Sequence, residues 1–207
     1  MPRLTPASPH GLDPVRRLVY RFARRMYGRE LEPTRAIAHH RPLLLGFAAI
    51  GLASERYARS VDPALKYLAM LRAAQLIGCE WCLDFGSWLA QNAGLPEEKL
   101  RELSSWSSSQ TFSPLERLVL EYTDAMTRTP VDVSDELFTR LREHFDERQM
   151  VELTMAIALE NLYSRTNWTL GIGGEGFSEG MYCVVPASPS VAAALESPEA
   201  SELPVAG

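Results

Sequence analysis

The sequence predicts an all-α fold of about seven to nine helices. Apolar residues recur at the three- and four-residue spacing of amphipathic helices along most of the chain. Helix-start signals recur as well, such as Asp62-Pro63 and the capping box of Ser113 with Glu116. No segment shows the strict alternation of a half-buried strand. Together these observations favour helices packed on helices.

The N-terminal part predicts a loose arm followed by a basic amphipathic helix. Three prolines lie in residues 1–13, and from Pro14 the apolar positions fall at helical spacing. Seven arginines precede residue 30 and fill the other face. We expect this helix to dock on the body of the protein, with a partner or a membrane surface as alternatives.

The middle of the chain predicts three helices with clear boundaries. The apolar run 43–53 follows Pro42 and is about half the length of a bilayer crossing, so it is interpreted as a core helix. A helix from Pro63 is interrupted at Gly78, and the next is expected to run from about Cys79 to Asn92, closed by Gly94.

The second half predicts further helices, and the chain divides into three parts. Helices are expected after Pro96, Ser113, Ser134 and Asp146, the last ending near Gly171. The expected organisation is an arm and basic helix over residues 1–34, a helical domain over 35–180, and a low-complexity, disordered tail over 181–207.

Composition narrows the function classes. A net charge of −5 argues against a general nucleic-acid binder, because such affinity rests on Lys and Arg. We expect neither a secretory signal nor a membrane span, and three cysteines do not suggest a secreted disulfide scaffold. We therefore expect a cytoplasmic protein, where a close cysteine pair is typical of redox or metal chemistry.

Cys79 and Cys82 are the strongest candidates for chemistry. Positions i and i+3 share one helix face, so the two thiols can close a disulfide. A thiol in the first turn sees the positive end of the helix dipole, which favours the thiolate, the nucleophile toward peroxides and disulfides. On this argument alone Cys79 is the more activated.

Other interpretations of the cysteines remain open. The pair could be two small core residues. Zinc normally takes four ligands, and only Cys183 and the His39-His40 pair could add to it, so no metal and no cofactor is expected. Cys183 is expected to be packed or free.

The stretch 73–84, Ala-Ala-Gln-Leu-Ile-Gly-Cys-Glu-Trp-Cys-Leu-Asp, resembles the signature of the alkylhydroperoxidase D-like branch of the carboxymuconolactone decarboxylase family. Residues 112–117, 151–154 and 160–172 resemble the same family, so the likeness covers roughly 35–180. It implies a compact helical bundle, a homo-oligomer (dimer, trimer or hexamer), and a cysteine pair that reduces hydroperoxides or small disulfides. It also implies a dithiol reductant, a lipoylated or thioredoxin-like protein, with Cys82 as the attacking thiol and Cys79 as its partner.

Two positions depart from that branch. Gly86 stands where it usually has a histidine, and Tyr67 where it usually has a glutamate, so the usual proton relay cannot operate as it stands. Candidates for a substitute relay or for the pocket wall are Asp84, Tyr67, Ser87 and Trp81. Asn161, Arg165 and Asn167 are expected to share one face of the last helix.

We therefore expect a thiol–disulfide oxidoreductase of the peroxidase type with a non-standard proton relay. One alternative is a small-molecule lyase or isomerase, in which turnover does not need the cysteines. Another is a redox-responsive oligomeric binding protein without catalysis.

Overall fold

The computed structural model describes residues 2–5, 7 and 13–187, and within these ranges it contains helices and no strand. Nine α-helices, one π-helical turn and one 3₁₀ turn account for the regular structure of this part of the chain. The all-α prediction and the expected number of helices are confirmed.

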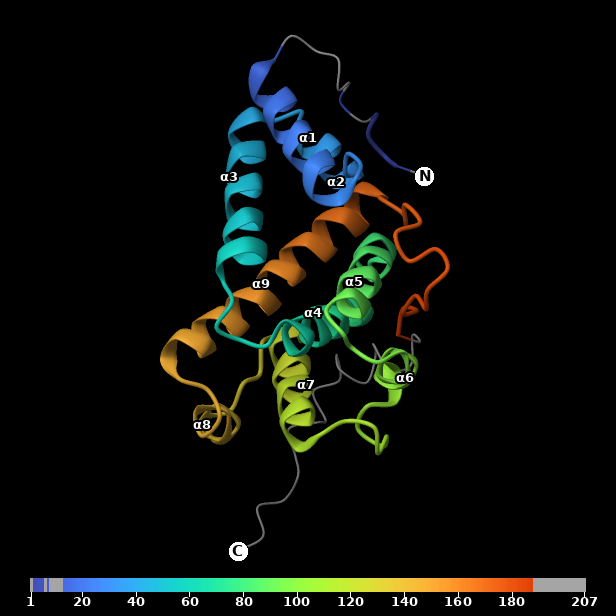
Figure 1. The fold of residues 1–207 in the computed structure, drawn as a ribbon. Helices are drawn as coiled ribbons and strands as arrows, with labels where there is room; N and C mark the ends of the chain where they lie inside the picture. Colours follow the sequence, from blue (N-terminus) through green and yellow to red (C-terminus); the bar gives the residue numbers. More distant parts are fainter. Residues whose placement is uncertain (1, 6, 8–12, 188–207) are drawn as a thin grey trace, which may run out of the picture.

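The helices follow one another with short connections (Figure 1). They are α1 (Pro14–Tyr27), α2 (Glu32–Ile37), α3 (Arg41–Leu52), the π-helix Ala53–Tyr57, α4 (Pro63–Ile77), α5 (Glu80–Asn92), α6 (Glu97–Glu102), the 3₁₀ turn Leu103–Ser105, α7 (Pro114–Thr127), α8 (Asp135–Arg142) and α9 (Glu147–Leu170).

Local signals in the sequence set most of these boundaries. The Ser113 and Asp146 capping boxes open α7 and α9, and the side chains of Asp13 and Asp62 cap α1 and α4. Gly78 ends α4 in the left-handed conformation at φ 82°, which glycine adopts without strain. The predicted helix starts are therefore largely confirmed.

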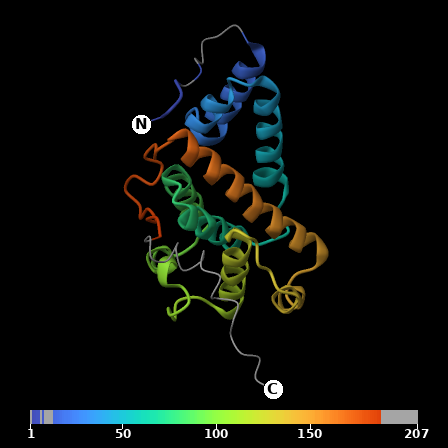
Figure 2. The same cartoon turned by 180° about the vertical axis from the view of Figure 1, so that it is seen from behind.

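Helix α4 forms the centre of the core and packs against α5, α7 and α9. The long helix α9 crosses the molecule diagonally in both views (Figures 1 and 2). Helices α1 to α3 lie in the upper part of the molecule in these views, and α6 to α8 lie in the lower part. Fully buried leucine and isoleucine side chains fill the space between these helices, among them Leu68, Leu71, Leu83, Leu120, Leu153 and Ile157.

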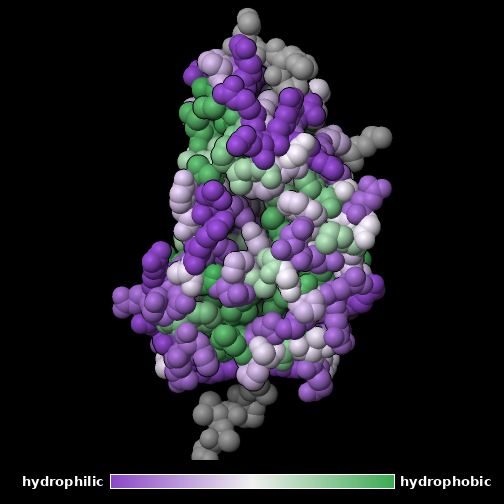
Figure 3. Space-filling model, in the orientation of Figure 1, coloured by the Kyte–Doolittle hydropathy of each residue, from purple (hydrophilic) through white to green (hydrophobic). Residues whose placement is uncertain are grey.

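The prediction that residues 43–53 form a core helix is wrong. Within α3 only Leu44 is buried, whereas Leu43 is 61% exposed and Leu45 is 48% exposed. The hydrophobic colour over α3 in Figure 3 shows this apolar outer face. A run of apolar residues shows that a helix is hydrophobic but not which elements cover it. The described part of the chain leaves the outer face of α3 uncovered.

Two buried ion pairs tie α4 to its neighbours. Arg72 donates two hydrogen bonds to the carboxylate of Asp124 in α7, at 2.7 and 2.9 Å. Lys66 donates to Glu152 in α9 at 3.0 Å and to the carbonyl of Ala58 at 2.6 Å. The second pair thereby fixes the connection between the π-helix and α4.

Residues 181–187 differ from the expected disordered tail. The backbone nitrogens of Val184 and Ala187 bond to the Ser87 hydroxyl and the Gln75 carbonyl, so this segment is held against α4 and α5. The low-complexity composition begins only at Ala187, and composition does not reveal hydrogen bonds to a distant helix. The rest of the predicted tail, 188–207, lies outside the described residues.

No helix among residues 2–5, 7 and 13–187 combines the length and the apolar character that a membrane crossing needs.

Candidate functional site

Cys79 and Cys82 form a disulfide at the N-terminus of α5, with their Cα atoms 5.3 Å apart. The left-handed Gly78 ends α4 and turns the chain directly into α5. Cys79 is the N-cap residue, and its sulfur accepts the backbone N–H of Cys82 at 3.2 Å. The predicted position of the pair at a helix start is therefore confirmed.

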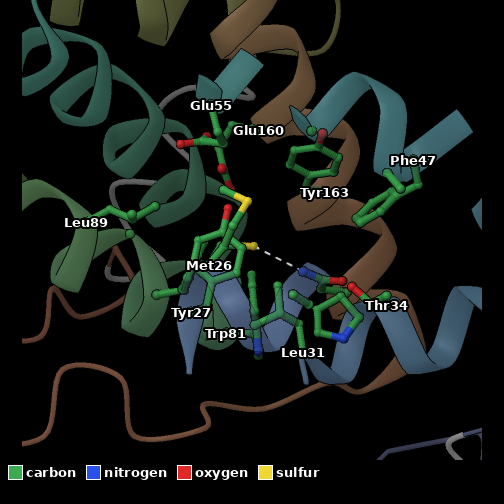
Figure 4. A pocket seen from close by; sticks show the side chains of 18 of the residues that line it. Met26, Tyr27, Leu31, Thr34, Phe47, Glu55, Trp81, Leu89, Glu160 and Tyr163 are labelled. Atoms are coloured by element: carbon green, nitrogen blue, oxygen red, sulfur yellow. Dashed lines mark hydrogen bonds between the residues drawn. The ribbon is translucent and has the colours of Figure 1, made fainter. Parts of the chain in front are cut away.

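The two sulfurs differ in what they face. Cys82 lines a cavity of about 140 Å³, whereas Cys79 is buried against the core outside that lining. Helices α1, α2, α3, α4, α5 and α9 and the π-helix all contribute to the cavity wall (Figure 4). A molecule in the cavity would therefore meet the sulfur of Cys82.

The cavity wall is mainly apolar and rich in aromatic rings. A cavity on the order of 150 Å³ is large enough to take up benzene. Phe22, which lines the cavity from α1, is 40% exposed, so the wall reaches the surface there, on the face that Figure 3 shows to be hollowed near its middle. The aromatic lining residues are Phe22, Tyr27, Phe47, Tyr67, Trp81, Phe85 and Tyr163.

Asn167 places a polar side chain against the reactive pair. Its amide Nδ2 donates to the sulfur of Cys82 at 3.4 Å, and its side chain is buried in the cavity wall. The expectation that Asn161, Arg165 and Asn167 share one face is wrong for Asn167, whereas Asn161 and Arg165 both contact Thr127. Asn161 donates to Thr127 on another side of α9, because a step of six residues turns a helix well away from its starting face.

Two carboxyl groups, Glu55 and Glu160, line the same cavity. In Figure 4 their side chains reach the same side of the cavity, away from Trp81 and Leu31. Burial raises the pKa of Glu160 to about 8, the Ser164 hydroxyl at 2.7 Å acts against the rise, and the charge of Glu55 adds to it.

Glu55 has a different environment. Burial raises the pKa of Glu55, whereas the hydrogen bond from the Tyr67 hydroxyl at 2.8 Å and the charge of Lys66 both act against that rise. The two carboxyls are therefore unequal, and Glu160 holds its proton to higher pH. Such pairs of unequal acids are typical of sites that move protons.

Of the four candidates for relay or pocket, Tyr67 and Trp81 lie in the cavity wall. The Tyr67 hydroxyl donates a hydrogen bond to Glu55. A carboxyl is therefore present next to the position at which the family branch usually has a glutamate. Trp81 stacks on Phe85 and donates its indole N–H to Glu175 at 2.6 Å.

Asp84 and Ser87 lie outside the cavity lining and bind the C-terminal segment instead. The carboxylate of Asp84 accepts the backbone N–H groups of Glu175, Phe177 and Ser178 at 2.8 to 3.1 Å. Burial acts to raise the pKa of Asp84, but these bonds outweigh it and hold the pKa below its usual range. The Ser87 hydroxyl accepts from Val184. Neither residue lines the cavity, because α5 turns both toward the C-terminal segment.

The position of the usual histidine, Gly86, lines the cavity and is crowded by Leu71. A Cβ atom on Gly86 would lie 3.0 Å from Cδ2 of Leu71, which is itself fully buried. The space that the histidine occupies in the family pattern is therefore partly filled by a leucine side chain of α4.

His39, His40 and Cys183 make their contacts elsewhere. His39 contacts the carbonyl of Thr5 at 2.8 Å, and His40 caps α3, so both lie in the N-terminal region away from the disulfide. Cys183 is a free, half-buried thiol. Among residues 2–5, 7 and 13–187 no group of three or more His, Cys, Asp or Glu is placed to bind a metal.

Sequence reasoning missed Glu55, Glu160 and Tyr163 as cavity residues. Glu160 and Tyr163 belong to the stretch 160–172 that resembles the family, so their segment was noticed without a role. Glu55 lies in a π-helical turn, a feature that occurs at functional sites but has no clear sequence signature.

The sequence profile of the carboxymuconolactone decarboxylase family matches residues 44–125, which include α4, α5 and the disulfide. The chain belongs to the carboxymuconolactone decarboxylase family. A relative is the uncharacterized protein YnjA of Escherichia coli K12, which is 39% identical over 122 residues, covering 59% of this chain and 67% of YnjA.

Solved structures of this family type share the fold. The alkylhydroperoxidase AhpD core of a peroxidase-related protein from Ralstonia eutropha JMP134 superposes with a TM-score of 0.76 at 16% identity, covering 88% of this chain and 97% of that one. The debrominase Bmp8, as a variant in complex with 2,3,4-tribromopyrrole, superposes with a TM-score of 0.72 at 17% identity, covering 84% and 92%. At these identities the likeness establishes the AhpD-like fold.

Proposed function

We propose that the protein is a thiol–disulfide oxidoreductase that reduces small hydroperoxides with the Cys79–Cys82 pair. The observation that carries the proposal is that Cys82 lines a mainly apolar cavity that reaches the surface at Phe22, while it is disulfide-bonded to Cys79. Membership in a family with AhpD-like structures supports the same reading.

In the reduced enzyme the Cys82 thiolate attacks the outer oxygen of the hydroperoxide. The O–O bond breaks, Cys82 becomes a sulfenic acid, and the leaving alkoxide takes a proton to become an alcohol. Cys79 then displaces hydroxide from the sulfenic sulfur, which leaves as water with one proton, and the disulfide forms. The peroxide gains two electrons and the dithiol loses two.

The position of Cys79 suits the return to the dithiol. A reductant that enters the cavity meets Cys82, so Cys79 is the sulfur that leaves when the disulfide opens. The N-terminus of α5 and the backbone N–H of Cys82 stabilise a thiolate at that position. The activation of Cys79 expected from the helix terminus thus supports a leaving-group role, with Cys82 as the attacking thiol.

The reductant is expected to be a dithiol on a slender arm or a small protein. The Cys82 sulfur lies within a narrow cavity, and this favours a lipoyl group over the flat surface of a thioredoxin-like protein. A second copy of the chain would find an apolar surface on α3, where Leu43 and Leu45 are exposed. We therefore propose a homo-oligomer that uses this surface.

Thiol counting tests the proposal directly. In a Cys183→Ser background, stoichiometric cumene hydroperoxide should remove both thiols within the reaction time, and lipoic acid in its dithiol form should restore them. The control is the same protein without peroxide. If the thiols persist, or if catalytic turnover of another kind survives loss of both cysteines, the oxidoreductase proposal is wrong.

The cavity is also expected to select substrates by charge. No side chain of Lys, Arg or His belongs to the cavity wall among the described residues, whereas two carboxyls do. Burying an anion there without a partner costs free energy, and each 1.4 kcal/mol is a factor of about ten in affinity. We expect kcat/KM for cumene hydroperoxide to exceed that for its para-carboxylate by roughly tenfold or more. Equal values would contradict the charge argument.

The aromatic cavity wall favours one further candidate reaction, the reductive removal of a halogen from an aromatic ring. Bmp8, which shares the fold, is a debrominase described with 2,3,4-tribromopyrrole. The balanced reaction exchanges a carbon–halogen bond for a carbon–hydrogen bond, releases halide with a proton, and converts the dithiol to the disulfide. Bromide release from 2,3,4-tribromopyrrole, measured with the dithiol reductant present, distinguishes it from peroxide reduction.

A further inference from the structure

We propose that Glu160 is the general acid of this site and supplies the proton that the departing alkoxide needs. The inference rests on the proposed peroxidase function and adds the residue that replaces the usual histidine. In the family pattern that histidine stands one turn after Cys82, where this chain has Gly86 packed against Leu71.

The geometry places Glu160 where a proton donor is needed. It lies on α9 and Cys82 on α5, and both side chains line the same cavity of about 140 Å³. Glu160 is 94% buried and has no cationic partner among the described residues, with a single hydrogen bond, from the Ser164 hydroxyl. A carboxyl in such a setting keeps its proton near neutral pH and can donate it.

A second polar group points to a ligand at this position. The hydroxyl oxygen of Tyr163, one turn from Glu160 on α9, is buried and finds no hydrogen-bond partner in the described part of the protein. Buried hydroxyls are normally paired, so a bound molecule is the natural partner for this one. A peroxide held by Tyr163 would have its oxygens beside the Glu160 carboxyl.

The other titratable groups around Glu160 do not fit the donor role. Burial raises the pKa of Glu55 from the π-helix as well, but its carboxylate already accepts the Tyr67 hydroxyl, and that bond and the charge of Lys66 act against the rise. Burial raises the pKa of Tyr163 to about 12, and burial also raises the pKa of Tyr27 from α1 and Tyr67 from α4, so these hydroxyls stay protonated throughout. The Cys82 thiol must lose its proton to react.

The proton balance is complete with this assignment. Glu160 gives its proton to the alkoxide as the O–O bond breaks, and the carboxylate is left next to the cavity. When the Cys79 thiol displaces hydroxide from the Cys82 sulfenic acid, the thiol proton and the hydroxide form water. The Cys82 thiol releases one proton to solvent when it forms the thiolate, and Glu160 takes up one proton from solvent before the next cycle, so no net proton is consumed.

The test compares two peroxides that differ in their leaving group. Cumene hydroperoxide releases an alkoxide, which needs a proton, whereas perbenzoic acid releases benzoate, which does not. At mildly acidic pH, Glu160→Gln should slow the reduction of cumene hydroperoxide about 100-fold and should leave that of perbenzoic acid nearly unchanged. The matched surface control is Glu121→Gln, whose carboxylate pairs with Arg140 on the exterior.

The pH profile gives a second readout that does not need the Gln variant. Because the acid form of Glu160 is required, activity of the wild type should fall above a pKa of about 8. The hydrogen bond from Ser164 lowers the pKa of Glu160. The Ser164→Ala variant should therefore move the falling limb of the pH–activity profile to higher pH. A purely structural effect of this variant would lower the activity without moving the limb.

The outcomes separate the two proposals. If Glu160→Gln slows both peroxides equally or neither, and the falling limb stays in place in Ser164→Ala, the general-acid assignment is overturned while the peroxidase proposal stands. If the wild type reduces neither peroxide, the proposed function fails and this inference fails with it.

Discussion

Replacing Cys82 by serine should abolish hydroperoxide reduction, with a loss of about 1,000-fold or more in rate. Cys82 is the sulfur that lines the cavity, and a serine hydroxyl is a far weaker nucleophile than a thiolate. The measurement is peroxide consumption in the presence of a small dithiol, with Cys183→Ser as the matched control because Cys183 lies outside the cavity lining.

The companion variant Cys79→Ser separates attack from resolution. Without reductant it should consume one equivalent of cumene hydroperoxide and then stop, because the Cys82 sulfenic acid has no neighbouring thiol to close the disulfide. Mass spectrometry after trapping with dimedone should locate the label on Cys82. If Cys82→Ser shows this single burst and Cys79→Ser shows none, Cys79 is the attacking thiol and our assignment is reversed.

Replacing Glu152 by alanine should lower the free energy of unfolding by about 3 to 5 kcal/mol, out of a typical total of about 5 to 15. The substitution leaves the ammonium of Lys66 buried without its partner. It also removes the acceptor of the Ser60 and Val61 backbone N–H groups. Urea unfolding followed by circular dichroism gives the value.

The control for this prediction is Glu121→Ala, which removes an exposed ion pair and should cost about 1 kcal/mol or less. Burial acts to raise the pKa of Glu152, but the bonds from Ser60 and Lys66 outweigh it, so the folded-state pKa is lowered. The wild type should therefore lose this stability as the pH falls below the ordinary carboxyl range, through that lowered pKa. If Glu152→Ala lowers the free energy of unfolding no more than Glu121→Ala does, the buried ion pair does not stabilise the fold.

The same variant should affect the site. Lys66 bonds to the carbonyl of Ser54, within the π-helical turn that carries Glu55, and to that of Ala58, which directly follows the turn. Loss of Glu152 frees Lys66 and loosens that connection. Hence the ion pair supports both the core and one wall of the cavity.

Local chemistry in the sequence predicted much of the fold. Capping residues such as Ser113 and Asp146 act on backbone groups within a few residues, and Gly78 adopts a left-handed φ that most residues avoid. The same holds for the disulfide, because Cys79 and Cys82 are neighbours on one turn. Interactions between residues that are only a few positions apart can be predicted from the sequence directly.

Predictions failed where a side chain meets something distant in the sequence. Asp84 and Ser87 were candidates for a relay because they follow Cys82 closely, but they bind residues about 90 positions later. The apolar run 43–53 was taken for core, but its outer face has no cover in the described chain. Spacing along a helix gives the direction of a side chain and not its partner.

The sequence by itself determined the helical class, most helix starts and the cysteine pair at the start of α5, because short-range backbone chemistry controls each of these. Only the tertiary structure decided that Cys82 rather than Cys79 lines a cavity, and that Glu55 and Glu160 reach that cavity from separate elements. The reason is that the pKa of a carboxyl and the access to a sulfur depend on surroundings assembled from six helices and a π-helical turn, which are brought together only by packing.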